Sequence, residues 1–331
     1  MAYRLFSQKQ QTVNLYISNY SIQLLELKSM DPLVVHRFYE SYLPEGIVAD
    51  GRIKDADKLS MILGQCIQDW GIKRKQVRFI TPDAFVSVRK VMVPVDLKDD
   101  EIKGYLYLEI GHNIHLPFEE PVFDFVPLQE NEKDKEILLF AAPEAIINDY
   151  TELLDDLKLE ASAADLSALS LYRLLFHQEH VSEKENTLLI EVKLDSMNLS
   201  IFEQLKPIFT RHLPLDGMLT NWSYKLDPET KLYYQYEIKE KELMLNHFRD
   251  TVMEIEKIIN FYRFTLHQGD HQITQIILLG DNPYIEKFME ILQESVTMIN
   301  VSQPLTKVYT HKNMAVPKKF HTVLGLALKE V

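Results

Sequence analysis

A chain of 331 residues, 46% hydrophobic and 26% charged, is long enough for two or three domains with buried cores, and its composition excludes wholesale disorder. With 36 basic and 49 acidic residues the net charge is −13, which disfavours nucleic acid and anionic lipid as general partners. The one cysteine excludes an internal disulfide and a zinc site built on cysteines, and fits the reducing cytosol.

No stretch of the sequence predicts insertion into a membrane. Residues 1–11 are polar and lack the apolar central segment of a signal peptide. The longest apolar runs, such as Ile276 to Leu279, are far shorter than the roughly 20 residues of a spanning helix. We therefore expect a cytoplasmic protein that reaches the inner face of the cell membrane only through partner proteins.

The first 82 residues predict a meander of antiparallel strands, a helix and a short buried strand. The strands are expected over 13–17, 22–27, 33–42 and 77–80. The helix is expected from Asp55, a favourable N-cap, to Trp70, before Gly71. Its apolar residues recur every three or four positions, which also predicts that the thiol of Cys66 is buried rather than nucleophilic.

The next block predicts strand, helix, strand, strand, helix, strand. These elements are expected over 85–93, 97–114, 122–128, 136–141, 143–157 and 159–163. Their order is that of a ferredoxin-like split βαββαβ unit of about 80 residues, close to the size of a small domain. We therefore expect a subdomain inserted at 83–163.

The second half repeats the opening pattern. After a helix over 166–176 and a polar linker, a second meander is expected over 187–192, 199–203 and 208–212, which indicates an internal duplication. The clearest helix covers about 240–266, with one apolar seam that we expect to pack on its own domain. The remaining expected elements are a strand over 273–279, a helix to 294, a strand over 296–301 and a helix from Pro317. The tyrosine-rich segment 218–240 gives no clear assignment.

This order of elements resembles the actin-like ATPase fold and, more narrowly, the family of the type IV pilus assembly protein PilM, which is related to FtsA. Five stretches are similar to motifs of that family: 43–55, 91–94, 114–125, 276–280 and 324–328. The resemblance implies an α/β, actin-like (RNase H-like) fold of two lobes. Residues 1–82 would form the first core subdomain, completed by about 164–185 and by 317–331. Residues 83–163 would form the insert, and 186–316 the second lobe.

In actin-like ATPases two hairpin turns each present an aspartate and a glycine to the phosphates and the magnesium ion. On the family pattern, the corresponding positions here are Tyr16, Ser18 and Gln23 in the first turn, Glu191, Lys193 and Met197 in the second, and Gly280 and Asp281 on the adenosine side. A tyrosine cannot hold magnesium as a carboxylate does, and side chains in place of glycine obstruct the approach of phosphate. We therefore expect a degenerate site with no catalytic residue, no metal and no bound ATP or magnesium.

Two other interpretations of these positions stay open. In the first interpretation, an unusual magnesium and phosphate site is formed by Glu191, Asp195 and Lys193. In the second, these three residues stand at strand ends and face solvent.

The resemblance implies a cytoplasmic scaffold of a type IV pilus or of the related competence machine. Its partner would be the short cytoplasmic N-terminal tail of a PilN-like membrane protein, docked between the first core subdomain and the insert. By position alone, the candidate groove residues are Phe85, Val86, Tyr105 and Tyr107, although ordinary core packing would also explain them. Association with further copies of the chain stays open.

Two alternatives belong to other functional classes. One is an active actin-like ATPase or filament-forming protein of the FtsA type. The other is a sugar or acid kinase, which the three altered turns disfavour. The pairs His112/His115 and His177/His180 have spacings that can bind metal, but no ligand framework accompanies them, so we expect solvated surface histidines.

Overall fold

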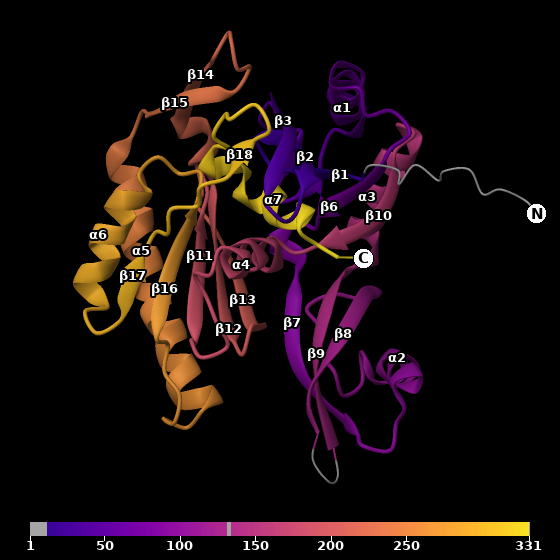
Figure 1. Ribbon diagram of the computed structural model, residues 1–331. Coiled ribbons are helices and arrows are strands. Elements are labelled where there is room, and N and C mark those ends of the chain that lie inside the picture. The colour runs from indigo at the N-terminus through magenta and orange to yellow at the C-terminus, as the bar shows by residue number, and fades with distance from the viewer. Residues whose placement is uncertain (1–11, 131–133, 331) are drawn as a thin grey trace, which may run out of the picture.

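The computed structural model describes residues 12–130 and 134–330, which form two lobes and a smaller insert (Figure 1). Each lobe contains a sheet covered by helices, and the insert extends from the first lobe and runs beside the second. Among the described residues, no helix has the length and apolar character needed to cross a membrane.

The first lobe is built on a six-stranded sheet in the order β10-β6-β1-β2-β3-β18. Its strands are β1 (Val13–Ile17), β2 (Ser21–Ser29), β3 (Val34–Tyr42), β6 (Gln76–Ile80), β10 (Glu160–Asp165) and β18 (Tyr309–Thr310). β1, β2 and β3 are antiparallel neighbours, whereas β1 and β6 run parallel. The predicted meander and the predicted buried strand are therefore confirmed, and β18 is an addition that the sequence did not suggest.

Helices cover both faces of this sheet because successive residues of a strand point to opposite sides. On one face, Leu15 packs in a core with residues of α1 (Ala56–Trp70) and α3 (Glu144–Asp156). On the other, Tyr16 packs with residues of α7 (His321–Ala327), which lies against α4 (Ser167–His177). The two helices cross so closely at Gly325 that a Cβ atom there would lie 1.8 Å from the carbonyl oxygen of Ser170.

The ends of α1 follow the predicted signals. The side chain of Asp55 accepts a hydrogen bond from the backbone N–H of Lys58 at 3.0 Å, which satisfies one of the free donors of the first turn. At the other end Gly71 adopts φ +62°, the left-handed conformation in which glycine ends a helix without strain.

The second lobe repeats the topology of the first. Its sheet has the order β13-β12-β11-β16-β17. The strands are β11 (Thr187–Val192), β12 (Ser196–Glu203), β13 (Lys206–Pro214), β16 (Gln275–Gly280) and β17 (Asn300–Ser302). β11 is antiparallel to β12 and parallel to β16, as β1 is to β2 and β6. The topology therefore agrees with the internal duplication predicted from the two meanders.

The long helix of the second lobe packs on its own domain, as predicted. α5 (Lys241–Asn260) contributes Phe248, Val252 and Ile255 to the core beneath the sheet. It then widens into a π-helix over Phe261–Leu266, where the sequence predicted a continuous α-helix. α6 (Ile285–Ser295) packs beside α5.

The insert is smaller than the sequence predicted. It consists of β7 (Ser87–Pro94), α2 (Asp99–Glu109), β8 (Pro121–Glu130) and β9 (Asp134–Pro143), with the strand order β7-β9-β8. The expected last strand is present as β10, but it pairs with β6 in the first lobe. The reason is that α3 buries Tyr150 and Leu153 in the core of the first lobe, which carries the chain back to that sheet. The element order βαββαβ is thus present, but the boundary at 163 is wrong, because the insert's own sheet ends at Pro143.

The tyrosine-rich segment forms a hairpin of β14 (Trp222–Leu226) and β15 (Tyr233–Ile238) at the outer end of the second lobe (Figure 1). A shorter hairpin joins β4 (Val48–Ala49) and β5 (Arg52–Ile53) before α1. Single 3₁₀ turns cover Asp83–Phe85, Leu219–Asn221 and Lys318–Phe320.

Candidate functional site

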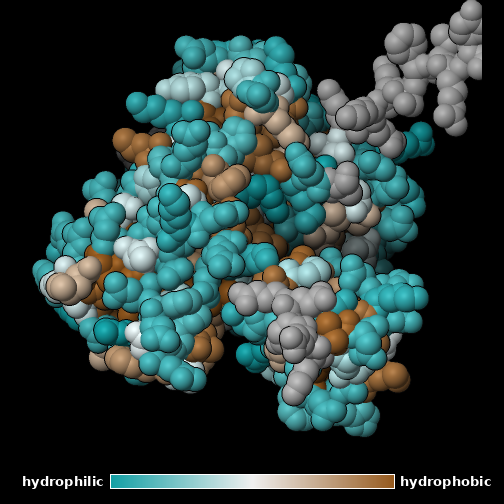
Figure 2. Space-filling model, turned by 60° about the horizontal axis from the view of Figure 1, so that its bottom comes forward, coloured by the Kyte–Doolittle hydropathy of each residue, from teal (hydrophilic) through white to brown (hydrophobic). Residues whose placement is uncertain are grey.

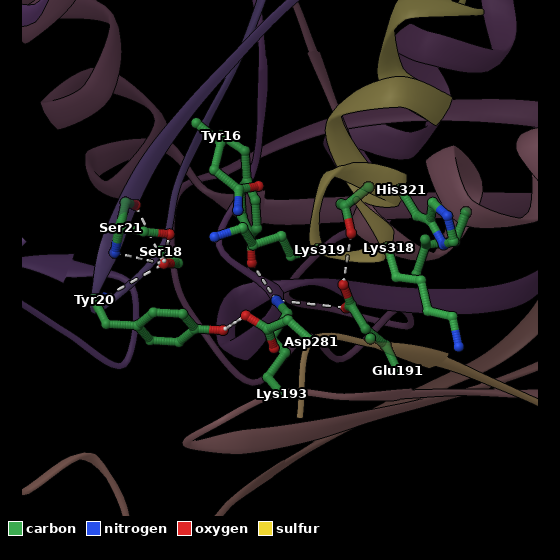
Figure 3. Close-up of a pocket in the computed structure, with 14 residues that line it drawn as sticks. Tyr16, Ser18, Tyr20, Ser21, Glu191, Lys193, Asp281, Lys318, Lys319 and His321 are labelled. Carbon is green, nitrogen blue, oxygen red and sulfur yellow. Dashed lines mark hydrogen bonds and ion pairs between the residues drawn. The ribbon is translucent and has the colours of Figure 1, made fainter. Parts of the chain in front are cut away.

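The cleft between the lobes lies where the β1–β2 turn, the β11–β12 turn and the end of β16 meet (Figure 3). Seven of the eight positions aligned with the nucleotide site line one small cavity there: Tyr16, Ser18, Gln23, Glu191, Lys193, Gly280 and Asp281. The eighth, Met197, is fully buried in the core of the second lobe. The topology therefore brings the predicted turns together, as in an actin-like cleft.

Lys193 occupies the centre of the cleft. Its ammonium group lies 3.0 Å from a carboxylate oxygen of Asp83 and 3.4 Å from one of Glu191, and it donates a short hydrogen bond to the hydroxyl of Tyr16. The residue is only 6% exposed. Burial alone would lower the pKa of Lys193, but the charges of Asp83 and Glu191 outweigh it and raise the pKa well above its ordinary value. A fixed positive charge thus sits between two carboxylates from different parts of the chain.

Protein donors also occupy the carboxylates around Lys193. The amide of Asn198 donates to Asp83 and to Glu191, at 2.8 Å in both cases. The hydroxyl of Thr322 donates to the other oxygen of Glu191 at 2.7 Å. Burial would raise the pKa of Asp83, but Lys193 outweighs that effect and lowers it. Both carboxylates therefore share one ammonium group and are hydrogen-bonded from within the protein.

The β1–β2 turn is closed by one of its own side chains. The hydroxyl of Ser18 accepts a hydrogen bond from the backbone N–H of Ser21 at 2.9 Å, and one from Tyr20 at 3.3 Å. These N–H groups are therefore engaged within the turn, whereas a glycine would leave them without a side-chain acceptor. Gly280, by contrast, is required by packing, because a Cβ atom at its φ of +135° would lie 2.1 Å from the carbonyl oxygen of Val192.

Direct hydrogen bonds join the lobes across the cleft. The hydroxyl of Tyr20 donates to Asp281 at 2.6 Å, and the amide of Asn19 donates to Asp195 at 2.7 Å. Burial raises the pKa of Asp281 to about 7, even though the hydrogen bond from Tyr20 acts in the opposite direction.

The β14–β15 hairpin makes a second set of contacts between the lobes. Glu40 of β3 accepts a hydrogen bond from the backbone N–H of Tyr233 at 3.0 Å, and Lys319 bonds both to Glu40 and to the carbonyl oxygen of Tyr233. The ring of Tyr42 lies 4.5 Å from that of Tyr224 and 5.6 Å from that of Tyr233, measured between centroids. The tyrosine-rich segment therefore serves as a contact between the two lobes.

The cleft contains little open space. The two cavities along it have volumes of about 10 and 40 Å³, whereas small-molecule sites usually measure about 300–1,000 Å³. The side chains of Tyr16, Lys193 and Asp281 lie in the cavity lining (Figure 3). The solvent-facing interpretation is wrong for Glu191 and Lys193, which are 3% and 6% exposed.

Sequence reasoning missed three residues around Lys193. Asp83 pairs with its ammonium group, whereas Asn198 and Thr322 donate hydrogen bonds to its carboxylate partners. The three residues lie in separate elements, and none carries a local motif. The one available signal is a lysine at a position where the fold pattern has glycine, because a buried lysine must be matched by nearby carboxylates.

The four candidate groove residues lie in two places. Phe85 and Val86 are half-buried where the chain enters the insert, and the guanidinium of Arg52 lies 4.4 Å from the ring centre of Phe85. Tyr105 and Tyr107 lie on α2, where they line neighbouring depressions of about 330 and 590 Å³. Neither Phe85 nor Val86 lines those two depressions.

Comparison with known proteins agrees with this architecture. The family model described as "Type IV pilus assembly protein PilM" matches residues 14–331. A solved structure titled "PilM-PilN type IV pilus biogenesis complex" superposes with a TM-score of 0.77 at 17% identity, covering 96% of this chain and 98% of that one.

A second solved structure, the ethanolamine utilization protein EutJ from Carboxydothermus hydrogenoformans, gives a TM-score of 0.51 at 12% identity, over 96% of this chain and 88% of its own. A comparison with curated proteins finds no match. Two actin-like lobes and a family match over nearly the whole sequence lead to one conclusion: the chain belongs to the type IV pilus assembly protein PilM family.

Proposed function

We propose that this chain is a scaffold of type IV pilus assembly at the inner face of the cell membrane, where it captures the cytoplasmic tail of a PilN-like membrane protein. The family match and the likeness to a PilM in a solved PilM–PilN complex support this assignment. One observation favours a scaffold over an active ATPase. The ammonium group of Lys193 lies 3.0 Å from Asp83 inside the cleft, where a nucleotide would otherwise bind.

The insert offers a docking surface for such a tail. A depression of about 590 Å³ is lined by Tyr107, Leu116, Pro117 and Phe118, and Tyr107 is 61% exposed. Figure 2 shows apolar side chains on the insert within a mostly hydrophilic surface. Exposed apolar groups of this kind often mark a protein interaction site.

The backbone beside this depression suits an extended peptide. β8 begins at its rim and is an edge strand of the insert's sheet, so one side of it has no strand partner there among the described residues. An added strand would pair with the backbone while apolar anchors enter the depression. The exposed Glu119 and Glu120 at the rim favour a tail with basic residues beside its anchors.

Replacing Tyr107 with alanine is expected to weaken binding of a PilN-like tail peptide at least tenfold, about 1.4 kcal/mol, because the exposed ring would be a central apolar anchor. Isothermal titration calorimetry with the peptide measures the change. Phe264→Ala is the matched control, since Phe264 is 57% exposed on the second lobe. Equal affinity for the Tyr107 variant and the unmodified chain would contradict the assignment to this surface.

A titration with Mg-ATP is expected to give no heat of binding at millimolar nucleotide. The reason is that Lys193 and its carboxylate partners fill the cleft, whose cavities of about 10 and 40 Å³ hold only water-sized molecules. Saturable heat with one site per chain would favour the alternative of an active actin-like ATPase. It would also mean that the contacts between the lobes open.

A further inference from the structure

Three side chains that the proposed function does not use meet at one end of the second lobe. Glu203 ends β12, whereas His267 and His271 lie in the segment between the π-helix and β16. Their ligand atoms all lie within 4.8 Å of one another. Sequence reasoning considered two other histidine pairs and overlooked this one, because Glu203 is more than 60 residues from either histidine.

Local backbone geometry brings the two imidazole rings together. A π-helical turn places residues five apart on the same face, so that the ring of Tyr262 lies 4.7 Å from that of His267. Gln268 and Gly269 then adopt φ of +52° and +100°, and the chain folds back. The ring of His271 consequently stacks on that of His267 at a centroid distance of 4.3 Å.

Both histidines direct a nitrogen at Glu203. His271 Nδ1 lies 2.9 Å from one carboxylate oxygen, and His267 Nε2 lies 3.3 Å from the other. In a tetrahedral zinc site with bonds of about 2.1 Å, neighbouring ligand atoms are separated by roughly 3.4 Å. The present separations therefore need only small side-chain movements to surround one ion.

The cluster also leaves buried polar atoms incompletely paired. Among the described residues, the hydroxyl of Tyr262 has no hydrogen-bond partner, and Glu203 Oε2 and His267 Nε2 face each other at 3.3 Å without the geometry of a hydrogen bond. Buried polar atoms are rarely left unpaired, so this place has capacity for a further ligand.

The donor set indicates which ion would bind. Two imidazoles and one carboxylate suit zinc and related transition metals, whereas magnesium and calcium prefer oxygen ligands. The side chains of Glu203 and His267 are 14% and 15% exposed, and that of His271 is 47% exposed. The site is thus largely buried at Glu203 and His267 and open to solvent at His271.

We propose that Glu203, His267 and His271 bind a divalent transition-metal ion, with zinc as the preferred ion, and so fasten the α5–β16 connection to the end of β12.

The test is calorimetric titration of the chelator-treated chain with zinc chloride at neutral pH. One zinc ion per chain is expected to bind. Glu203→Gln and His271→Ala should each weaken the affinity at least about 100-fold, since even the loss of a residue that only orients a metal ligand costs about 10–100-fold. His112→Ala is the matched control, because His112 is an exposed histidine outside the cluster, and it should leave the affinity unchanged.

Two further measurements make the result independent of folding defects. Zinc should raise the melting temperature of the unmodified chain and of the His112 variant, but not of the two cluster variants. Cobalt substitution should give the visible spectrum of a tetrahedral site only where the cluster is intact. Absence of zinc binding in the unmodified chain would overturn the proposal. So would equal zinc affinity in the folded Glu203→Gln variant.

Discussion

Replacing Lys193 with methionine is expected to lower the free energy of unfolding by about 3–5 kcal/mol, the usual cost of removing one partner from a buried ion pair. Methionine has a similar length and fills a similar volume, so the loss reports on charge rather than on a cavity. Without the ammonium group, Asp83 and Glu191 face each other across the cleft with only neutral donors between them. Urea denaturation followed by circular dichroism measures the change.

Two controls distinguish this effect from a general loss of a lysine. Lys58→Met removes a lysine that pairs with Asp55 on the exposed side of α1, and it should leave the urea midpoint unchanged. Adding Asp83→Asn to Lys193→Met should recover part of the lost stability, because one uncompensated charge is removed. A double variant less stable than Lys193→Met alone would contradict the charge balance described here.

Replacing Asp281 with asparagine is expected to stabilise the protein increasingly as the pH rises. The buried carboxyl has a pKa of about 7 in the folded chain, above the value of about 3.9 in an unfolded chain. Between these values the folded state holds the proton more tightly. The stability that Asp281 contributes is therefore complete below about pH 4 and is lost as the pH rises through 7.

From pH 5 to pH 8.5 the advantage of the Asp281→Asn variant should grow by roughly 2–3 kcal/mol. Urea titrations at several pH values measure this difference. Tyr20→Phe is the matched control, because it removes the hydrogen bond at 2.6 Å but keeps the buried carboxyl, so its pH dependence should persist. An Asp281→Asn advantage that stays constant with pH would contradict the raised pKa.

Much of the fold could be predicted because local signals and burial agree. The apolar run of β1, the cap at Asp55 and the periodic seam of α5 are each a local signal that agrees with the tertiary packing. The boundary of the insert could not be predicted in this way. A strand such as β10 has the same local pattern whether it joins the sheet of the insert or that of the first lobe. It joins the first lobe because α3 buries Tyr150 and Leu153 in the core there.

The candidate site also has a part that the sequence predicts and a part that it does not. The turn positions were predictable because they follow from element order. The hydrogen bonds of Lys193 were not, because Tyr16, Asp83 and Lys193 are separated by 67 to 177 residues and meet only in the folded chain. The β14–β15 hairpin escaped assignment because its stabilising contacts, with Glu40 and Tyr42, come from the other lobe.

The way the insert is attached has a mechanical consequence. Its two chain connections, before β7 and after β9, both run into the first lobe, and neither passes through the second. Tension on a peptide held by the insert would therefore be carried by the peptide bonds and the sheet of one lobe. The hydrogen bonds between the lobes would bear little of that force, so a loaded molecule would keep its cleft closed.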